Sequence, residues 1–79
     1  MSEVKPAKTL DVRGLMCPMP VVKLSKAIKE IEVGQVIEVL ATDPGSLTDM
    51  PAWAKRTGNE VVKVEREGKV IKFYVKRLK

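Results

Sequence analysis

The chain has 79 residues and carries 15 lysines and arginines against 10 acidic residues, a net charge of +5. Its length fits one small domain, and with 4% aromatic residues the core must be mainly aliphatic. The sequence contains no histidine, which excludes Ser–His and Cys–His catalytic dyads and argues against a zinc site. We therefore expect no metal and no cofactor.

The single cysteine cannot form an internal disulfide, so the composition points to a reducing compartment, the cytoplasm. The sequence shows no signal peptide and no apolar run long enough to cross a bilayer, and we expect no membrane association. The positive charge favours acidic partners, either protein surfaces or RNA.

The first half of the chain predicts a strand, a helix and a second strand. Residues 1–8 are polar and are expected to form a flexible tail, followed by a strand over residues 9–12. Apolar residues recur at helical spacing over residues 18–32, and Gly34 ends that amphipathic helix. Residues 36–41 are rich in β-branched side chains and predict a central strand, joined to the first one by a right-handed parallel crossover.

The second half predicts a helix and a hairpin. Residues 42–45 form a turn at the same sheet edge as the loop before Cys17. A helix over residues 46–57 should have an irregular start, with Thr48 or Asp49 as its cap, because Pro51 does not fit deep inside a helix. Trp53 is expected to fill the core rather than to stack on a base.

The final hairpin is predicted over residues 61–67 and 70–76, around Gly68. The side chains expected to face inward are Val62, Val64, Ile71, Phe73 and Val75. The opposite, exposed face would carry Lys63, Lys72, Tyr74 and Lys76, a positive surface that is more often simply solvated than used to hold RNA.

These elements predict an α+β two-layer sandwich in one domain over residues 9–79. The order is strand, helix, strand, helix, strand, strand, with a mixed four-stranded sheet and two helices on one of its faces.

The chemistry-bearing stretch is Cys17-Pro18-Met19-Pro20, preceded by Gly14. Proline suits the first turn of a helix and biases the residue before it towards extended geometry, so Cys17 is expected at the helix N-cap. Free N–H groups and the positive helix pole should lower the pKa of the thiol, with the Met19 N–H as the available hydrogen-bond donor to the sulfur. The alternative is a buried, inert cysteine.

With Leu10-Asp11 and Gly14-Leu15 before this motif, then Asp43-Pro44 and Asp49-Met50-Pro51, the chain resembles the TusA/SirA-like sulfur carrier proteins over residues 9–76. The resemblance implies a fold similar to the C-terminal domain of translation initiation factor three. It also implies a persulfide on Cys17, positioned by Pro18, Met19, Pro20 and Gly14.

The resemblance further implies a sulfurtransferase-type carrier that takes sulfur from a cysteine desulfurase or a rhodanese-like protein. It would pass this sulfur to an acceptor protein in tRNA thiolation, cofactor synthesis or sulfur metabolism. Arg13 and Met16 are candidate docking contacts, and Ala54 stands near the place of a second cysteine in some members. An RNA-binding module and a thiol redox sensor remain open as alternatives.

Overall fold

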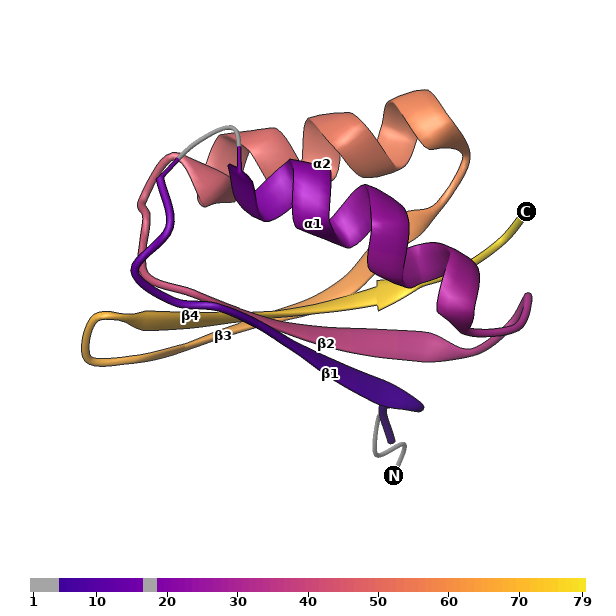
Figure 1. Ribbon diagram of the computed structural model, residues 1–79, viewed down its shortest axis with the longest axis horizontal. Coiled ribbons are helices and arrows are strands. Elements are labelled where there is room, and N and C mark those ends of the chain that lie inside the picture. Colours follow the sequence, from indigo (N-terminus) through magenta and orange to yellow (C-terminus); the bar gives the residue numbers. More distant parts are fainter. Residues whose placement is uncertain (1–4, 17–18) are drawn as a thin grey trace.

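The computed structural model describes residues 5–16 and 19–79 and consists of two layers (Figure 1). Four strands form one sheet, and both helices cover the same face of it, while the other face is open. The elements are β1 (Lys8–Val12), α1 (Met19–Ala27) with the 3-10 turn η1 (Ile28–Glu30), β2 (Val36–Ala41), α2 (Ser46–Thr57), β3 (Glu60–Glu67) and β4 (Val70–Lys76).

The sheet has the order β1-β2-β4-β3 and is mixed. β1 pairs with β2 in parallel, whereas β4 is antiparallel to both β2 and β3. The α+β sandwich expected from the sequence is therefore confirmed, including the parallel crossover through α1. β1 begins at Lys8, one residue earlier than predicted, and residues 1–4 of the expected tail lie outside the described residues.

The core lies between the sheet and the two helices and is built mainly from aliphatic side chains. In β2 the burial alternates residue by residue, as expected for a strand with one face against helices. The fully or nearly fully buried side chains include Val12, Leu24, Ile31, Ile37, Val39, Met50, Trp53, Ile71, Phe73 and Val75. Trp53 is thus a core residue, and its indole N–H donates to Ser25 Oγ at 2.8 Å.

β3 differs from the predicted pattern because it contains a bulge. The register shifts between Val61, which pairs with Val75, and Lys63, which pairs with Tyr74. Val61 therefore packs against the core in place of Val62, which is exposed, so the inward assignment of Val62 is wrong. Val64 pairs with buried Phe73 but remains 43% exposed, because β3 is an edge strand.

α2 begins at Ser46 and continues through Pro51, so the cap predicted at Thr48 or Asp49 is wrong, while the first turn is irregular as predicted. The amide groups of its first residues donate to carbonyls three residues back, from Asp43 onward, and Gly45 rather than Thr48 or Asp49 precedes the helix. Proline at position 51 removes only the bond that its N–H would make to Leu47. Leu47 is 37% exposed and Pro51 is exposed as well, so the missing bond lies on the outer side of the helix.

α1 is shorter than the predicted helix over residues 18–32. Its regular part ends at Ala27, and η1 continues the chain to Glu30. Gly34 follows with a φ of 93°, and its N–H donates to the Arg77 carbonyl at 2.6 Å, which ties this turn to the end of β4. Among the described residues, no helix is long and apolar enough to cross a membrane.

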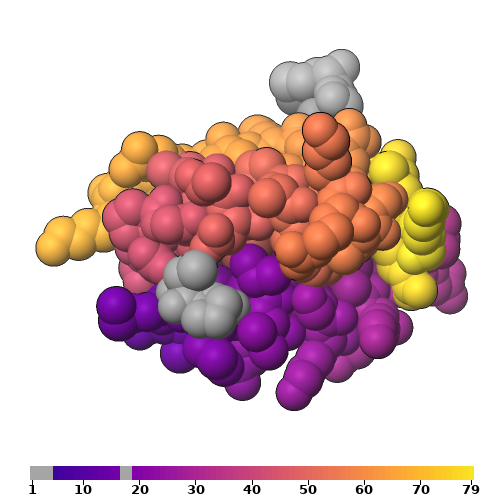
Figure 2. Space-filling view, turned by 90° about the horizontal axis from the view of Figure 1, so that it is seen from above, coloured from indigo at the N-terminus to yellow at the C-terminus, as the bar shows by residue number. Residues whose placement is uncertain are grey.

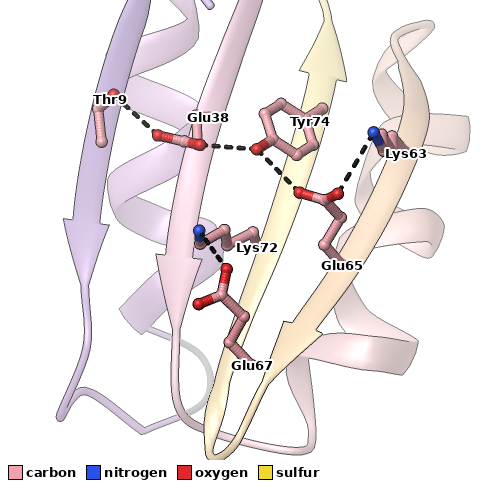
Figure 3. A network of polar contacts seen from close by, with 7 residues as sticks. All are labelled: Thr9, Glu38, Lys63, Glu65, Glu67, Lys72 and Tyr74. Carbon is pink, nitrogen blue, oxygen red and sulfur yellow. Dashed lines mark hydrogen bonds and ion pairs between the residues drawn. The ribbon is translucent and has the colours of Figure 1, made fainter. Parts of the chain in front are cut away.

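The open face of the sheet carries a polar network centred on Tyr74 (Figure 3). Its hydroxyl lies 2.8 Å from Glu38 Oε2 and 3.2 Å from Glu65 Oε1, and Thr9 Oγ1 donates to Glu38 at 3.1 Å. Lys63 and Lys72 form ion pairs with Glu65 and Glu67 at 3.3 and 2.9 Å. Lys63 and Lys72 are thus paired with carboxylates, and Lys76 lies opposite Glu60 in the strand register, so the expected positive face is not found.

Tyr74 is 8% exposed, so its predicted exposure is also wrong. The phenol is covered because β2 and β3 place long carboxylates on either side of it, at Glu38 and Glu65. The hydrogen bond to Glu38, burial and the charge of Glu38 raise the pKa of Tyr74 above its ordinary value of 10.

Replacing Tyr74 by phenylalanine tests this network. At neutral pH we expect the free energy of unfolding to fall by about 1–2 kcal/mol, because two carboxylates lose a shared donor. Since the pKa of Tyr74 is raised in the folded state, its contribution is complete below about pH 10 and is lost as the pH rises further. Urea unfolding should therefore show a steeper loss of stability above this pH in the parent protein than in Tyr74→Phe. Equal slopes would contradict the assignment.

Candidate functional site at one edge of the sheet

Two loops meet at the edge of the sheet where the parallel strands β1 and β2 end (Figure 1). One loop leads from β1 to α1 and contains the cysteine motif, and the other leads from β2 to α2. The Gly14 N–H donates to Thr42 Oγ1 at 2.9 Å, a direct bond between the two loops. The predicted proximity of these loops is confirmed, because parallel strands direct their carboxyl ends to the same edge.

A tight turn starts the first loop immediately after β1. The Leu15 N–H donates to the Val12 carbonyl at 3.2 Å, and Gly14 occupies the third position of this turn with a φ of 82°. Other residues adopt such a φ at a cost, which explains the glycine. Val12 is fully buried, so the turn is anchored in the core at its first residue.

Asp11 and Arg13 clamp the outer side of this turn. Arg13 donates from Nε to Asp11 Oδ1 and from an Nη atom to Oδ2, both at 2.9 Å, and its backbone N–H reaches Oδ1 at 3.0 Å. These hydrogen bonds lower the pKa of Asp11 to about 2. Both side chains are about half exposed, so the pair orients the Arg13 guanidinium at the surface.

Two methionines, Met16 and Met19, stand on either side of the dipeptide Cys17-Pro18. Met16 is 77% exposed and Met19 is 42% exposed. The Met19 N–H donates to the Met16 carbonyl at 2.9 Å. The bond predicted from this N–H to the sulfur involves Cys17 and therefore stays a prediction. Cys17 and Pro18, with the predicted N-cap geometry, lie outside the described residues.

Pro20 fixes the first turn of α1 against the body of the protein. Its side chain is fully buried, in contrast to that of Met19 beside it. One turn later Val22 is 40% exposed and Leu24 is fully buried. The helix therefore turns one face into the core and presents Met19 and Val22 next to the cysteine loop.

The helix that follows the cysteine loop, α1, contains no acidic residue. α1 has no carboxylate in its first turn, and Lys23 and Lys26 lie on its exposed side. Ion pairs between described residues do not involve these two lysines. Within the described chain, no group of three or more Cys, Asp or Glu side chains is arranged to hold a metal ion.

The second loop adds a residue that the sequence analysis did not select, Thr42. Thr42 directly follows β2, the strand that pairs with β1. A hydroxyl residue at the end of this neighbouring strand is the sequence feature from which its contact with the cysteine loop could have been predicted. The same loop is held by Asp43, whose Oδ1 accepts the Gly45 N–H at 3.1 Å. The motif residues Asp43-Pro44 thus shape the start of α2, whereas Thr42 contacts the cysteine loop itself.

Comparison with known proteins gives a family match over residues 8–77, to the sulfurtransferase TusA family. The chain belongs to this family. The TusA protein of Allochromatium vinosum, a sulfur carrier protein, is 44% identical over 68 residues, 86% of this chain and 90% of that protein. The SirA-like protein from Desulfitobacterium hafniense has a similar structure, with a TM-score of 0.77, 29% identity and coverage of 91% of this chain and 99% of that one.

Relatives of this TusA-family chain differ in length. The putative sulfur carrier protein YrkI of Bacillus subtilis is 43% identical over 94% of this chain and 99% of its own length. A putative sulfur carrier protein of Aquifex aeolicus is 49% identical over 98% of this chain, which spans only 39% of that protein. The chain likewise spans 40% of YrkF of Bacillus subtilis. The TusA domain is thus found both alone and within longer proteins.

The clamp between Asp11 and Arg13 can be tested by titration. Because the pKa of Asp11 is lowered, the contact is present above its ordinary value of 3.8 and is lost as the pH falls through about 2. The side-chain carboxyl carbon of Asp11 should therefore titrate by NMR with a midpoint near 2. In Arg13→Gln the midpoint should rise towards 3.8. An unchanged midpoint in this variant would show that Arg13 is not the cause.

Proposed function

We propose that this protein is a persulfide sulfur carrier that accepts sulfane sulfur on Cys17 and passes it to an acceptor protein. The observation that carries the proposal is the match to the TusA family over residues 8–77, which includes the Cys-Pro-x-Pro motif. Relatives named as sulfur carriers support this role. The site offers one thiol and no histidine, which suits a transfer that needs neither a base nor a metal.

The chemistry of such a transfer is a pair of thiolate substitutions. The Cys17 thiolate attacks the outer sulfur of a donor persulfide, a new S–S bond forms, and the donor's S–S bond breaks with its electron pair leaving on the donor thiolate. An acceptor thiolate then attacks the outer sulfur, and Cys17 leaves as thiolate. Each step moves one sulfur atom and consumes no oxidant or reductant.

The described residues around Cys17 support this chemistry in two ways. α1 begins two residues after the cysteine and has no carboxylate in its first turn, so its positive pole favours an anionic sulfur nearby. The Val12–Leu15 turn on one side and buried Pro20 on the other anchor the loop at both ends. An anchored loop can hold a sulfur atom for insertion into another protein's active site.

The exposed apolar residues beside the motif support a protein partner. Met16, Met19 and Val22 together offer an apolar contact area, with Lys23 and Lys26 on the same helix. A donor or acceptor with an apolar active-site entrance and acidic residues around it would match this surface. We propose a cysteine desulfurase or a rhodanese-like protein as the donor, and the cytoplasm as the place of transfer. The acceptor would use the sulfur in tRNA thiolation, cofactor synthesis or sulfur metabolism.

Loading with sulfur is the decisive experiment. After incubation with a cysteine desulfurase and cysteine, the intact mass should increase by one sulfur atom, and a thiol reductant should remove it. Cys17→Ser should show no increase, and Lys55→Gln, an exposed residue in the last turn of α2 that is outside the proposed docking surface, should load like the parent protein. A parent protein that gains no sulfur from the desulfurase, or from a persulfide donor of low molecular weight, would refute the proposal.

The same samples separate the alternatives. A redox sensor would gain oxygen on Cys17 or form an intermolecular disulfide, without gaining sulfur. An RNA-binding module would retain RNA in Cys17→Ser, with an affinity that falls steeply as salt is added.

The hydrogen bond from Gly14 to Thr42 should affect transfer without affecting the fold. In Thr42→Val we expect sulfur transfer at saturating donor to slow about fivefold, the equivalent of one hydrogen bond of about 1 kcal/mol. Alkylation of Cys17 by iodoacetamide should be unchanged, because the thiol remains accessible. Thr48→Val, on the exposed side of α2, is the matched control. Equal transfer rates in both variants and the parent would contradict a positioning role of Thr42.

A further inference from the structure

A cavity of about 260 Å³ lies at the far end of the helical layer from the cysteine loop. Its lining residues come from the C-terminal halves of α1 and α2, from η1 and from the segments that follow α2 and β4. Figure 1 shows these ends on the same side of the molecule, and Figure 2 shows the yellow C-terminal segment beside the orange end of α2. Ser25, the lining residue of α1 nearest the cysteine loop, lies six residues after Met19, roughly 9 Å along the helix axis, so this cavity is separate from the proposed sulfur site. Its lining residues are Ser25, Ile28, Lys29, Trp53, Thr57, Asn59, Arg77 and Lys79.

The charged side chains of this lining all have the same sign. Three cationic side chains, Lys29, Arg77 and Lys79, border the cavity, and the lining residues of the described chain include no Asp or Glu. The ion pairs between described residues do not involve any of these three cations. Three positive side-chain charges around a small cavity attract an anion placed between them.

Arg77 is held in place by contacts that leave part of its guanidinium free. Its Nη1 donates to the Ile31 carbonyl at 2.6 Å and its Nε to the backbone oxygen of Lys79, the last residue of the sequence, at 2.7 Å. Its backbone pairs with Gln35 and Gly34. A guanidinium has five N–H groups, so three remain after these two bonds. Arg77 is therefore preorganised and still able to donate to a ligand.

The uncharged polar groups of the lining are also donors. Ser25 Oγ accepts the Trp53 indole N–H at 2.8 Å, which leaves its own hydroxyl hydrogen to be donated. Asn59 Oδ1 accepts the Leu78 N–H, and its Nδ2 donates one hydrogen to Thr57 Oγ1 and retains the other. The acceptor atoms of these side chains are thus occupied within the protein, while hydrogens remain for an external acceptor.

We propose that this cavity is a binding site for a small oxyanion, a phosphate or sulfate group, free or as part of a small metabolite. Its three cations supply the charge, and Ser25 and Asn59 supply neutral donors, the combination that recognises tetrahedral oxyanions. The volume is close to the lower limit for small-molecule sites and exceeds the space that one inorganic anion fills. The site is independent of Cys17 and of the proposed sulfur transfer.

A purely structural role of the cations makes a different prediction. Both helices direct their negative C-terminal poles to this end, and Lys79 lies against Gly58, where a Cβ would come within 2.8 Å of its side chain. If the cations served only to stabilise these helix ends, their removal would lower the free energy of unfolding, and added anions would not bind saturably.

Trp53 is the only tryptophan of the chain and reports directly on the cavity. We would titrate the full chain with inorganic phosphate, and separately with sulfate, while sodium chloride keeps the ionic strength constant. The indole N–H signal of Trp53, measured by NMR, should shift saturably with either anion, because a ligand that engages the Ser25 hydroxyl alters the bond between Ser25 and Trp53. An equal shift with chloride alone, or a shift that does not saturate, would overturn the proposal.

Three variants locate the site. Lys29→Gln should weaken phosphate binding about two- to fivefold, the range expected for one exposed charge. Asn59→Asp, which keeps the acceptor for Leu78 and adds a negative charge to the lining, should weaken it at least as much. Lys26→Gln, on the same helix but outside the cavity, should bind as the parent does. Equal weakening by Lys26→Gln and Lys29→Gln would indicate a diffuse surface charge and refute a specific site.

Discussion

The parallel pairing of β1 with β2 is the constraint on which the rest of the site depends. It requires the chain to cross over through α1, and it brings the ends of both strands to one edge of the sheet. The cysteine loop and the loop after β2 therefore meet, and the bond between Gly14 and Thr42 links them. Without this pairing, the cysteine motif would stand at the start of a helix with no second loop beside it.

The helical layer and the open face of the sheet expose different kinds of side chain. The helical layer carries exposed apolar residues beside the motif and lysines with no carboxylate partner among the described residues. The open sheet face carries carboxylates and lysines paired with one another around Tyr74. The net positive charge of the chain is thus displayed mainly by the helical layer and the chain segments at its ends. This distribution weakens the case for RNA on the sheet and strengthens that for an acidic partner at the helices.

The two ends of the helical layer differ in the sign of the helix dipoles, which are positive at the N-termini and negative at the C-termini. The positive poles of both helices lie near the cysteine loop, where they favour the anionic sulfur of the proposed transfer. The negative poles lie at the opposite end, and there the protein places Arg77 and Lys79. The cavity between these cations, with its free donors, is the basis of the proposed oxyanion site at this end.

The sequence by itself determined the element order, the sandwich class and the position of the cysteine motif between strand and helix, because these depend on local periodicity and on proline and glycine. It did not determine that Val61 rather than Val62 packs inward, since an alternating pattern cannot show where a bulge shifts the register. It also missed the burial of Tyr74, which depends on Glu38, 36 residues away in the chain. The bond to Thr42 likewise joins residues 28 positions apart. Only the tertiary structure decides such contacts, because they arise from pairing between strands and not from the residues next to them in sequence.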